Sequence, residues 1–121
     1  KALGVESVKA VDAYDYKKTL ETIREELDRP GPSVLITNRP CVLMPKRVME
    51  KPYTVISEKC NACGACFQIG CPAISASKET GGKRNKPKAL IDPVLCTGCT
   101  LCAQVCRPEA IVMAEETSKV M

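Results

Sequence analysis

Eight of the nine cysteines in this 121-residue chain form two groups that repeat one spacing. Each group is a triplet with two residues between successive cysteines, followed by a fourth cysteine after a gap of three or four residues. Three thiolates at this spacing let one tight loop wrap a cubane of iron and sulfide and ligate three of its irons. The eight cysteines are Cys60, Cys63, Cys66 and Cys71 in the first group, and Cys96, Cys99, Cys102 and Cys106 in the second.

The fourth cysteine of each group lies near a proline, at Cys71-Pro72 and at Cys106-Arg107-Pro108. In two-cluster ferredoxins the cysteine beside a proline ligates the other cluster. The repeat therefore predicts two 4Fe–4S clusters whose fourth ligands are exchanged. We expect the first cluster to be held by Cys60, Cys63, Cys66 and Cys106, and the second by Cys96, Cys99, Cys102 and Cys71.

A cysteine-rich chain can also form a disulfide framework or bind zinc. No secretory segment opens the sequence and no apolar run is long enough to span a membrane, so we expect a reducing, cytoplasmic compartment. The chain has no histidine, which excludes Rieske-type ligation, Cys2His2 zinc and imidazole catalysis. Zinc in an all-cysteine site remains the alternative, although it does not need a third cysteine at the same short spacing.

The formal net charge of +4 is weak evidence for nucleic acid, and we expect neither a nucleic-acid partner nor a membrane. Eight thiolates and two cluster cores of about +2 each would bring the loaded protein close to zero. Five basic residues lie between Lys78 and Lys88, a stretch with Gly81-Gly82 that predicts an exposed hairpin loop. Such a run is usually solvated, and as a hypothesis it could attract an acidic electron carrier.

Small residues between the ligands, Ala62, Gly64 and Gly98, should let backbone N–H groups approach the sulfides. The gap between Cys66 and Cys71 has four residues, and we expect Gly70 to absorb the extra one in the turn.

Cys41 lies far from both groups. A buried or inert free thiol is the expected state. Phe67, Tyr14, Tyr16 and Tyr53 are expected to be packing residues.

The segment before the cysteines predicts one strand–helix–strand unit. Val5–Val11 is a candidate strand, and Asp15 can cap a helix that runs from Tyr16 to about Leu27. Pro30-Gly31-Pro32 ends this helix, and Ser33–Thr37 contains an apolar run suited to a strand buried on both faces. The apolar residues of the helix recur at four, three and four residues and form one stripe: Tyr16, Leu20, Ile23 and Leu27.

We therefore expect an α+β chain of two parts, a βαβ fragment at residues 1–45 and a cysteine domain at residues 46–121. The cysteine domain should contain two short antiparallel hairpins and two short helices, as in a bacterial-type 2x4Fe–4S ferredoxin. A single βαβ unit cannot bury its own faces, so either the rest of this chain covers it or it belongs to a larger α/β domain before Lys1; we favour the second. The expected short strands are Tyr53–Ser57, Ala73–Ala76, Ala89–Ile91 and Ile111–Ala114.

Cys60–Pro108 resembles a bacterial-type two-cluster ferredoxin domain, and the whole chain resembles the C-terminal part of the indolepyruvate ferredoxin oxidoreductase alpha subunit. Gly31-Pro32-Ser33-Val34-Leu35-Ile36, followed by Arg39-Pro40-Cys41-Val42-Leu43, is similar to the last strand and exit of that family's thiamine-diphosphate domain. The four-residue gap that ends at Cys71-Pro72-Ala73-Ile74 is similar to its ferredoxin module.

The resemblance implies an oxygen-sensitive 2-oxoacid oxidoreductase that uses thiamine diphosphate and coenzyme A on an arylpyruvate and passes electrons through clusters to an external ferredoxin. The chain has no Gly-Asp-Gly, the family's thiamine-binding signature, so thiamine diphosphate is expected only in the full-length enzyme. These residues would supply the electron exit and no catalytic residue, with the remainder of the alpha subunit and a second subunit as partners. An independent two-cluster ferredoxin and a structural metal-binding module are the alternatives.

Overall fold

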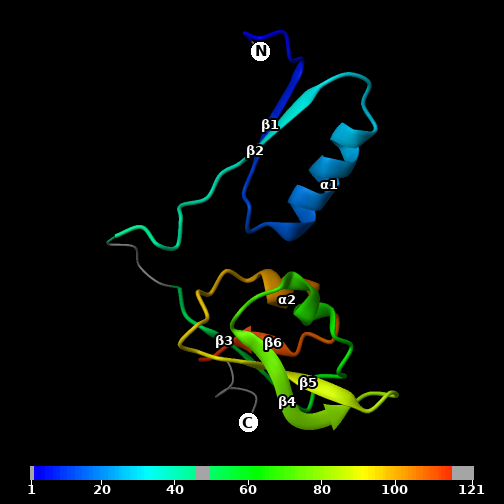
Figure 1. Ribbon diagram of the computed structural model, residues 1–121, viewed down its shortest axis with the longest axis vertical. Helices are drawn as coiled ribbons and strands as arrows, with labels where there is room; N and C mark the ends of the chain where they lie inside the picture. The colour runs from blue at the N-terminus through cyan, green and yellow to red at the C-terminus, as the bar shows by residue number, and fades with distance from the viewer. Residues whose placement is uncertain (1, 46–49, 116–121) are drawn as a thin grey trace. The chain divides into compact units, whose positions relative to one another are not determined.

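The computed structural model describes residues 2–45 and 50–115, and the chain divides into two compact units (Figure 1). The first unit comprises residues 1–45 and the second comprises residues 46–121. Within the described residues, no helix has the length and apolar character needed to cross a membrane.

The first unit is a βαβ motif. Strand β1 (Ser7–Val11) and strand β2 (Ser33–Thr37) pair in parallel, and helix α1 (Tyr16–Leu27) connects them. The side chain of Asp15 accepts a hydrogen bond from Lys18 N at 3.0 Å and so caps the first turn of the helix. The predicted bounds of the helix and of the second strand are confirmed, whereas the first strand begins two residues later than predicted.

Helix α1 buries a different face from the predicted apolar stripe. Its buried residues are Thr22 and Glu26, while Tyr16, Ile23 and Leu27 of the stripe are exposed, Leu27 by 78%. Glu26 is held there by Lys9 of β1, whose Nζ lies 2.9 Å from Glu26 Oε1. The ammonium of Lys9 places an opposite charge beside this buried carboxylate, and three of the four stripe residues are left exposed.

The β1–β2 sheet has one open face. Val8 pairs with Val34, and Ala10 pairs with Ile36, so their side chains share the face opposite Lys9. Val8, Val34 and Ile36 are exposed, Ile36 by 50%. Within this chain β2 is therefore covered on one face only, because a single helix can cover one face of a sheet but not both. Burial of the other face by a larger α/β domain stays a prediction.

The second unit contains two antiparallel strand pairs and two short helices, so the α+β class is confirmed. One pair joins β3 (Tyr53–Val55) to β6 (Ile111–Met113), and the other is the β4–β5 hairpin (Ile74–Gly81 and Lys86–Ile91). The helices are the 3-10 helix η1 (Ala65–Ile69) and helix α2 (Leu101–Val105). Within the stretch from Lys78 to Lys88, only residues 82–85 form a turn, so most of the predicted loop is strand.

Backbone hydrogen bonds show that the cysteine repeat is also a structural repeat. Cys60 N donates to Ile56 O, and Cys96 N donates to Asp92 O in the same way. Ile56 N in turn donates to Ala110 O at 2.7 Å, and Asp92 N donates to Ala73 O at 2.8 Å. Each copy is therefore tied to a residue that follows the other copy's fourth cysteine. This crossing of partners joins the two halves into one unit.

The core of the second unit is thin and contains cysteine side chains. Its buried residues are Ala73, Ile91, Cys102 and Ile111, and four further cysteines pack against them with other half-buried side chains. Among the described residues, no large side chain is less than 2% exposed. Little aliphatic surface is therefore available to hold the second unit together.

Candidate metal centre

The two cysteine loops share an unusual backbone geometry. Ala62 and Gly64 have φ values of 54° and 79°, and the equivalent residues of the second loop, Gly98 and Thr100, have φ values of 71° and 69°. Left-handed backbone is uncommon for Ala and Thr, so the loops adopt this shape even where glycine is absent. Two left-handed residues therefore lie between the first and the third cysteine of each triplet. The left-handed conformation is therefore shared by both loops whatever the residue type, whereas the predicted approach of backbone N–H groups to sulfides stays a prediction.

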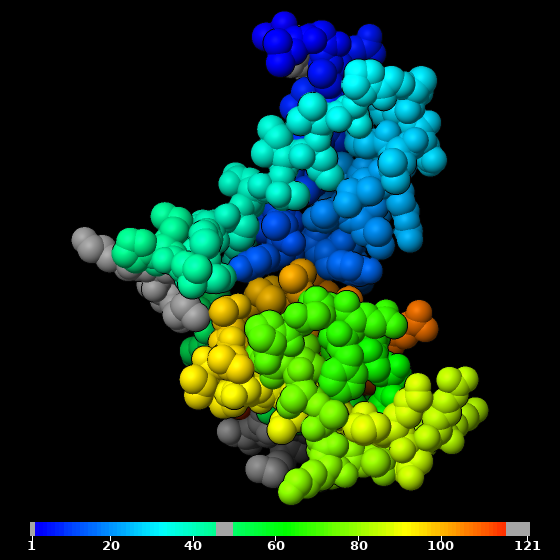
Figure 2. All heavy atoms as spheres, viewed as in Figure 1, coloured from blue at the N-terminus to red at the C-terminus, as the bar shows by residue number. Residues whose placement is uncertain are grey.

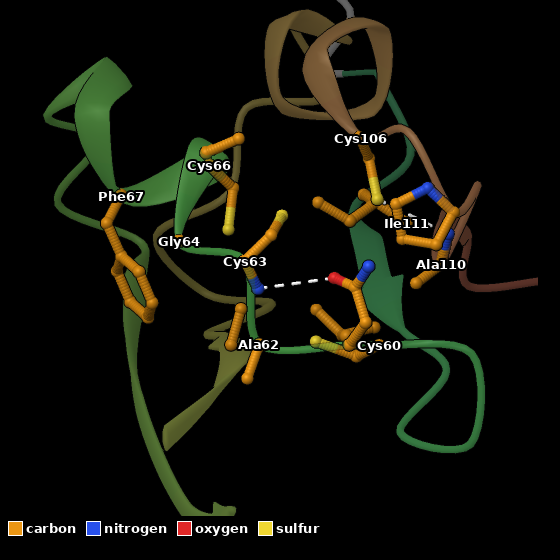
Figure 3. Close-up of a pocket in the computed structure, with 14 residues that line it drawn as sticks. Cys60, Ala62, Cys63, Gly64, Cys66, Phe67, Cys106, Ala110 and Ile111 are labelled. Atoms are coloured by element: carbon orange, nitrogen blue, oxygen red, sulfur yellow. Dashed lines mark hydrogen bonds between the residues drawn. The ribbon is translucent and has the colours of Figure 1, made fainter. Parts of the chain in front are cut away.

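A cavity with an empty volume of about 360 Å³ lies beside the first triplet (Figure 3). Its walls include Cys60, Cys63 and Cys66 together with Cys106 from the end of α2. The thiols of Cys63, Cys66 and Cys106 point into a common space in Figure 3. The remaining wall is mostly apolar and includes Val55, Ala62, Phe67, Ala89, Ala110 and Ile111.

A second cavity, with an empty volume of about 370 Å³, lies beside the other triplet. Its walls include Cys96, Cys99 and Cys102 together with Cys71, which follows the first triplet in sequence. The structure thus brings the eight cysteines together in the two sets of four in which they were predicted to act. Each set takes its fourth member from the other copy of the repeat.

Electrostatics within each set reflect the same grouping. Burial raises the pKa of the Cys66 thiol, and the charges of Cys106, Cys60 and Cys63 raise it further. Burial also raises the pKa of Cys102 to about 12, with smaller contributions from Cys99, Cys96 and Cys71. These shifts favour neutral thiols, so deprotonating four thiols beside an apolar cavity needs a cationic group between them.

One backbone N–H donor reaches a cysteine sulfur in each set. Ala110 N donates to Cys106 Sγ at 3.3 Å, and Tyr53 N donates to Cys96 Sγ at 3.4 Å. Both donors come from the β3–β6 end of the unit, outside the cysteine loops. Neither was predicted from the sequence, because a backbone donor carries no residue-type signal.

The cysteine loop of the first set is also held by Asn61 and by the β4–β5 hairpin. Asn61 Oδ1 accepts a hydrogen bond from Cys63 N at 3.2 Å. Lys88 Nζ donates to Ser57 O at 2.8 Å, and Gly82 lies against the carbonyl of Asn61. In the sequence, only the Gly81-Gly82 pair marks this region. By itself the pair predicts a turn and not the contact with the cysteine loop.

The remaining cysteine lies apart from both sets. Cys41 is a free, exposed thiol, so of the expected buried or inert states the buried one does not apply, and its Sγ accepts a hydrogen bond from Leu43 N. Gly70 ends η1 in left-handed backbone, with a φ of 72°, which places the extra residue of the first gap where it was expected. Within residues 2–45 and 50–115, no three cysteine, aspartate or glutamate side chains converge tightly enough to hold a single metal ion.

Known proteins share similarity with nearly the whole chain. The indolepyruvate oxidoreductase subunit IorA of Thermococcus kodakarensis is 41% identical over an alignment of 123 positions, which covers 96% of this chain and 18% of that protein. The chain is similar to part of the IorA subunit of indolepyruvate oxidoreductase. The IorA subunits of Methanothermobacter marburgensis and Archaeoglobus fulgidus are 38% and 31% identical and cover 92% and 93% of the chain. No family model matches the sequence.

The similarity to IorA confirms the resemblance predicted from the residues. The chain spans 17–18% of the length of these curated relatives. Each relative is named as one subunit of an oxidoreductase.

Proposed function

We propose that the second unit holds two 4Fe–4S clusters and carries electrons for an IorA-type oxidoreductase. The first cluster is held by Cys60, Cys63, Cys66 and Cys106, and the second by Cys96, Cys99, Cys102 and Cys71. In this proposal the unit is a bacterial-type two-cluster ferredoxin domain, and the first unit is the end of a larger α/β domain.

One observation carries the proposal: two sets of four cysteines line two cavities, and each set takes its fourth member from the other copy of the repeat. A single zinc ion would draw four sulfurs to within about 2.3 Å of one point. Thiols that share a cavity without converging on one point suit a larger, multi-iron group. Apolar walls suit it as well, because they limit the access of water and oxygen to iron and sulfide.

The residues of this chain have three tasks in the proposed site. When bound, the clusters supply one-electron storage and transfer. The eight thiolates neutralise iron charge, and the crossed fourth cysteines tie the two copies of the repeat together, so metal binding supports the thin core. The N–H groups of Ala110 and Tyr53 donate to ligand sulfurs and stabilise negative charge there.

The wider reaction follows from the relatives and belongs to the same proposal. An oxidoreductase that acts on indolepyruvate needs an exit for electrons, and this chain would supply that exit to an external ferredoxin. Thiamine diphosphate, the remainder of the alpha subunit and a second subunit would perform the carbon chemistry. We expect the assembly in a reducing, cytoplasmic compartment, where the thiols remain free for iron.

Anaerobic reconstitution with iron and sulfide tests the proposal. We expect about eight irons and eight sulfides per chain, and EPR signals of two interacting clusters after reduction. A Cys41→Ala variant is the matched control and should keep the full iron content, because Cys41 belongs to neither set.

Three results would favour the alternatives. Retention of zinc without a reducible signal would replace the proposal with a structural metal-binding module. Clusters that cannot be reduced reversibly would also remove the electron-transfer role. Reversible reduction without any effect of IorA partners on the potentials would favour an independent ferredoxin.

A further inference from the structure

We propose that the tip of the β4–β5 hairpin is the docking surface for an acidic electron-carrier protein, at the side of the first cysteine set. This inference rests on the proposed function, because it names where the partner of that function binds. The surface consists of three cations on the hairpin, Lys83, Arg84 and Lys86, together with the adjoining cysteine loop around Cys63.

The hairpin is fixed against the first cysteine loop. A Cβ on Gly82 would lie 2.3 Å from Asn61 O, so only glycine allows the turn to approach this closely. At the other end, Lys88 Nζ binds Ser57 O and Oγ, and Glu79 binds the Ser57 hydroxyl. These contacts hold the turn in place relative to the loop that precedes Cys63, and they engage Lys88 and Glu79 of the hairpin.

The three cations at the tip, Lys83, Arg84 and Lys86, lie on one side of the cysteine loop. A groove with an empty volume of about 500 Å³ separates the hairpin from the loop, and its lining includes three cations but no carboxylate. Its described lining residues are Asn61, Ala62, Cys63, Gly81, Gly82, Lys83, Arg84 and Lys86. In Figure 2 the hairpin turn, coloured yellow-green, protrudes at the surface of the second unit.

An apolar centre lies next to these cations. Cys63 is the exposed member of the first set, and Phe67 beside it is 37% exposed. A shallow hollow connects Cys63 and Phe67 with Ala62, Ala76, Lys86 and Pro87. An apolar contact next to a ligand cysteine, flanked by charges of one sign, suits a transient protein partner of opposite charge.

The loop of the second cysteine set packs against different charged residues. Its loop packs at Gly98 against Glu50 and Lys51, and Lys51 Nζ is paired with Glu115 at 2.6 Å. Charges of both signs therefore lie at this loop. The first loop also contacts a mixed pair, Lys88 and Glu79, but the groove beside Cys63 adds three cations and no carboxylate. Charge complementarity thus selects the first set as the one that meets an acidic carrier.

Binding of an acidic ferredoxin to the reconstituted full chain tests the inference, with a Lys83→Gln/Arg84→Gln/Lys86→Gln variant. Three exposed ion pairs lost together should raise Kd about tenfold at low ionic strength, and the difference should shrink at high salt. The control variant, Lys17→Gln/Lys18→Gln/Arg24→Gln, removes the same charge from α1 and should leave Kd within about twofold of the unchanged chain. Carbodiimide should cross-link the ferredoxin to Lys83 or Lys86.

An unchanged Kd in the hairpin variant, or an equal loss in the control, would overturn the inference. Cross-links at Lys51 or Lys59 alone would do the same. Heparin binding as tight as that of the ferredoxin would also overturn it, since the surface would then select any polyanion. Iron is counted on every sample. If the reconstituted chain holds iron but does not bind the carrier, only the docking surface is rejected. If the chain binds the carrier but takes up no iron on reconstitution, only the electron-transfer role is rejected.

Discussion

Gly82 lies against the carbonyl of Asn61, where a Cβ would be only 2.3 Å from the oxygen. The residue also has left-handed backbone, with a φ of 70°. This contact joins the β4–β5 hairpin to the residue that follows the first cysteine of the repeat. The cost of the left-handed backbone and the cost of the close approach can be separated by comparison with another glycine.

Gly82→Ala should destabilise the second unit more than Gly70→Ala does. Both glycines are left-handed, with φ values of 70° and 72°, but nothing lies within 4 Å of a Cβ on Gly70. Gly70→Ala should therefore cost about 1 kcal/mol for conformation alone. Gly82→Ala should cost a further 1–3 kcal/mol, roughly the penalty for overpacking. Urea unfolding of both variants, followed by circular dichroism, measures the difference, and equal losses would mean that the hairpin moves away without cost.

Exchanging single cysteines should assign the two fourth ligands. Cys106→Ala should remove the first cluster and leave the second, although Cys106 follows the second triplet in sequence. Cys71→Ala should have the opposite effect. About half of the iron and one EPR signal should remain in each variant. Loss of the second signal in Cys106→Ala would show that each repeat supplies its own fourth ligand.

Removing one N–H donor should lower the reduction potential of one cluster only. Ala110 N donates to Cys106 Sγ, and such bonds stabilise the more negative, reduced state. Ligation at Cys106 allows a synthetic segment of residues 106–121 in which lactic acid replaces Ala110, so an ester oxygen replaces the N–H. We expect a more negative potential for the first cluster in an EPR-monitored redox titration.

The control for the ester is the same ligated protein with an amide at Ala110. The ester keeps the methyl side chain and the Ala110 carbonyl that accepts from Ile56 N. The potential of the second cluster should stay at its amide value, because its donor is Tyr53 N. Equal shifts of both potentials would indicate a general loosening of the unit.

The stability of the first unit should depend on pH through Lys9. Hydrogen bonds from Ser7 and Lys9 lower the pKa of Glu26, and the bond from Lys9 lowers that of Glu25. Bonds to Glu25 and Glu26 raise the pKa of Lys9. The carboxylates thus contribute stability that is present above their ordinary value of 4.5 and is lost as the pH falls through the lowered pKa values.

The contribution of Lys9 to stability has the opposite pH dependence. Its contribution is present below its ordinary value of 10.5 and is lost as the pH rises through the raised pKa. Helicity at 222 nm in moderate urea should therefore fall at both pH extremes. Lys9→Gln should weaken both dependences, whereas Lys17→Gln on the exposed face of α1 should change neither. A Lys9→Gln profile that matches the unchanged chain would contradict the assignment.

Local features of the fold could be predicted from the sequence, because each depends on neighbours along the chain. Asp15 caps the helix that it precedes, and Pro30 follows the end of that helix. The cysteine spacing predicted both loops, since two residues between ligands leave little choice of path. The similarity to IorA was also visible in contiguous segments.

Tertiary structure decided what depends on distant residues. Helix α1 turns Glu26 inward because Lys9 lies beneath it, and the apolar periodicity of the helix alone could not show this. Thr100 adopts the left-handed backbone that Gly64 adopts in the other copy, because the loop geometry outweighs the preference of the residue.

The site follows the same division. Residue type and spacing identified eight thiols that can hold metal, because thiolate chemistry belongs to the side chain itself. The cavities, the N–H donors at Tyr53 and Ala110, and the position of the basic hairpin beside Cys63 emerged only from the packed chain. They depend on backbone groups and close approaches between segments far apart in sequence, and such contacts leave almost no trace in residue type beyond a glycine at position 82.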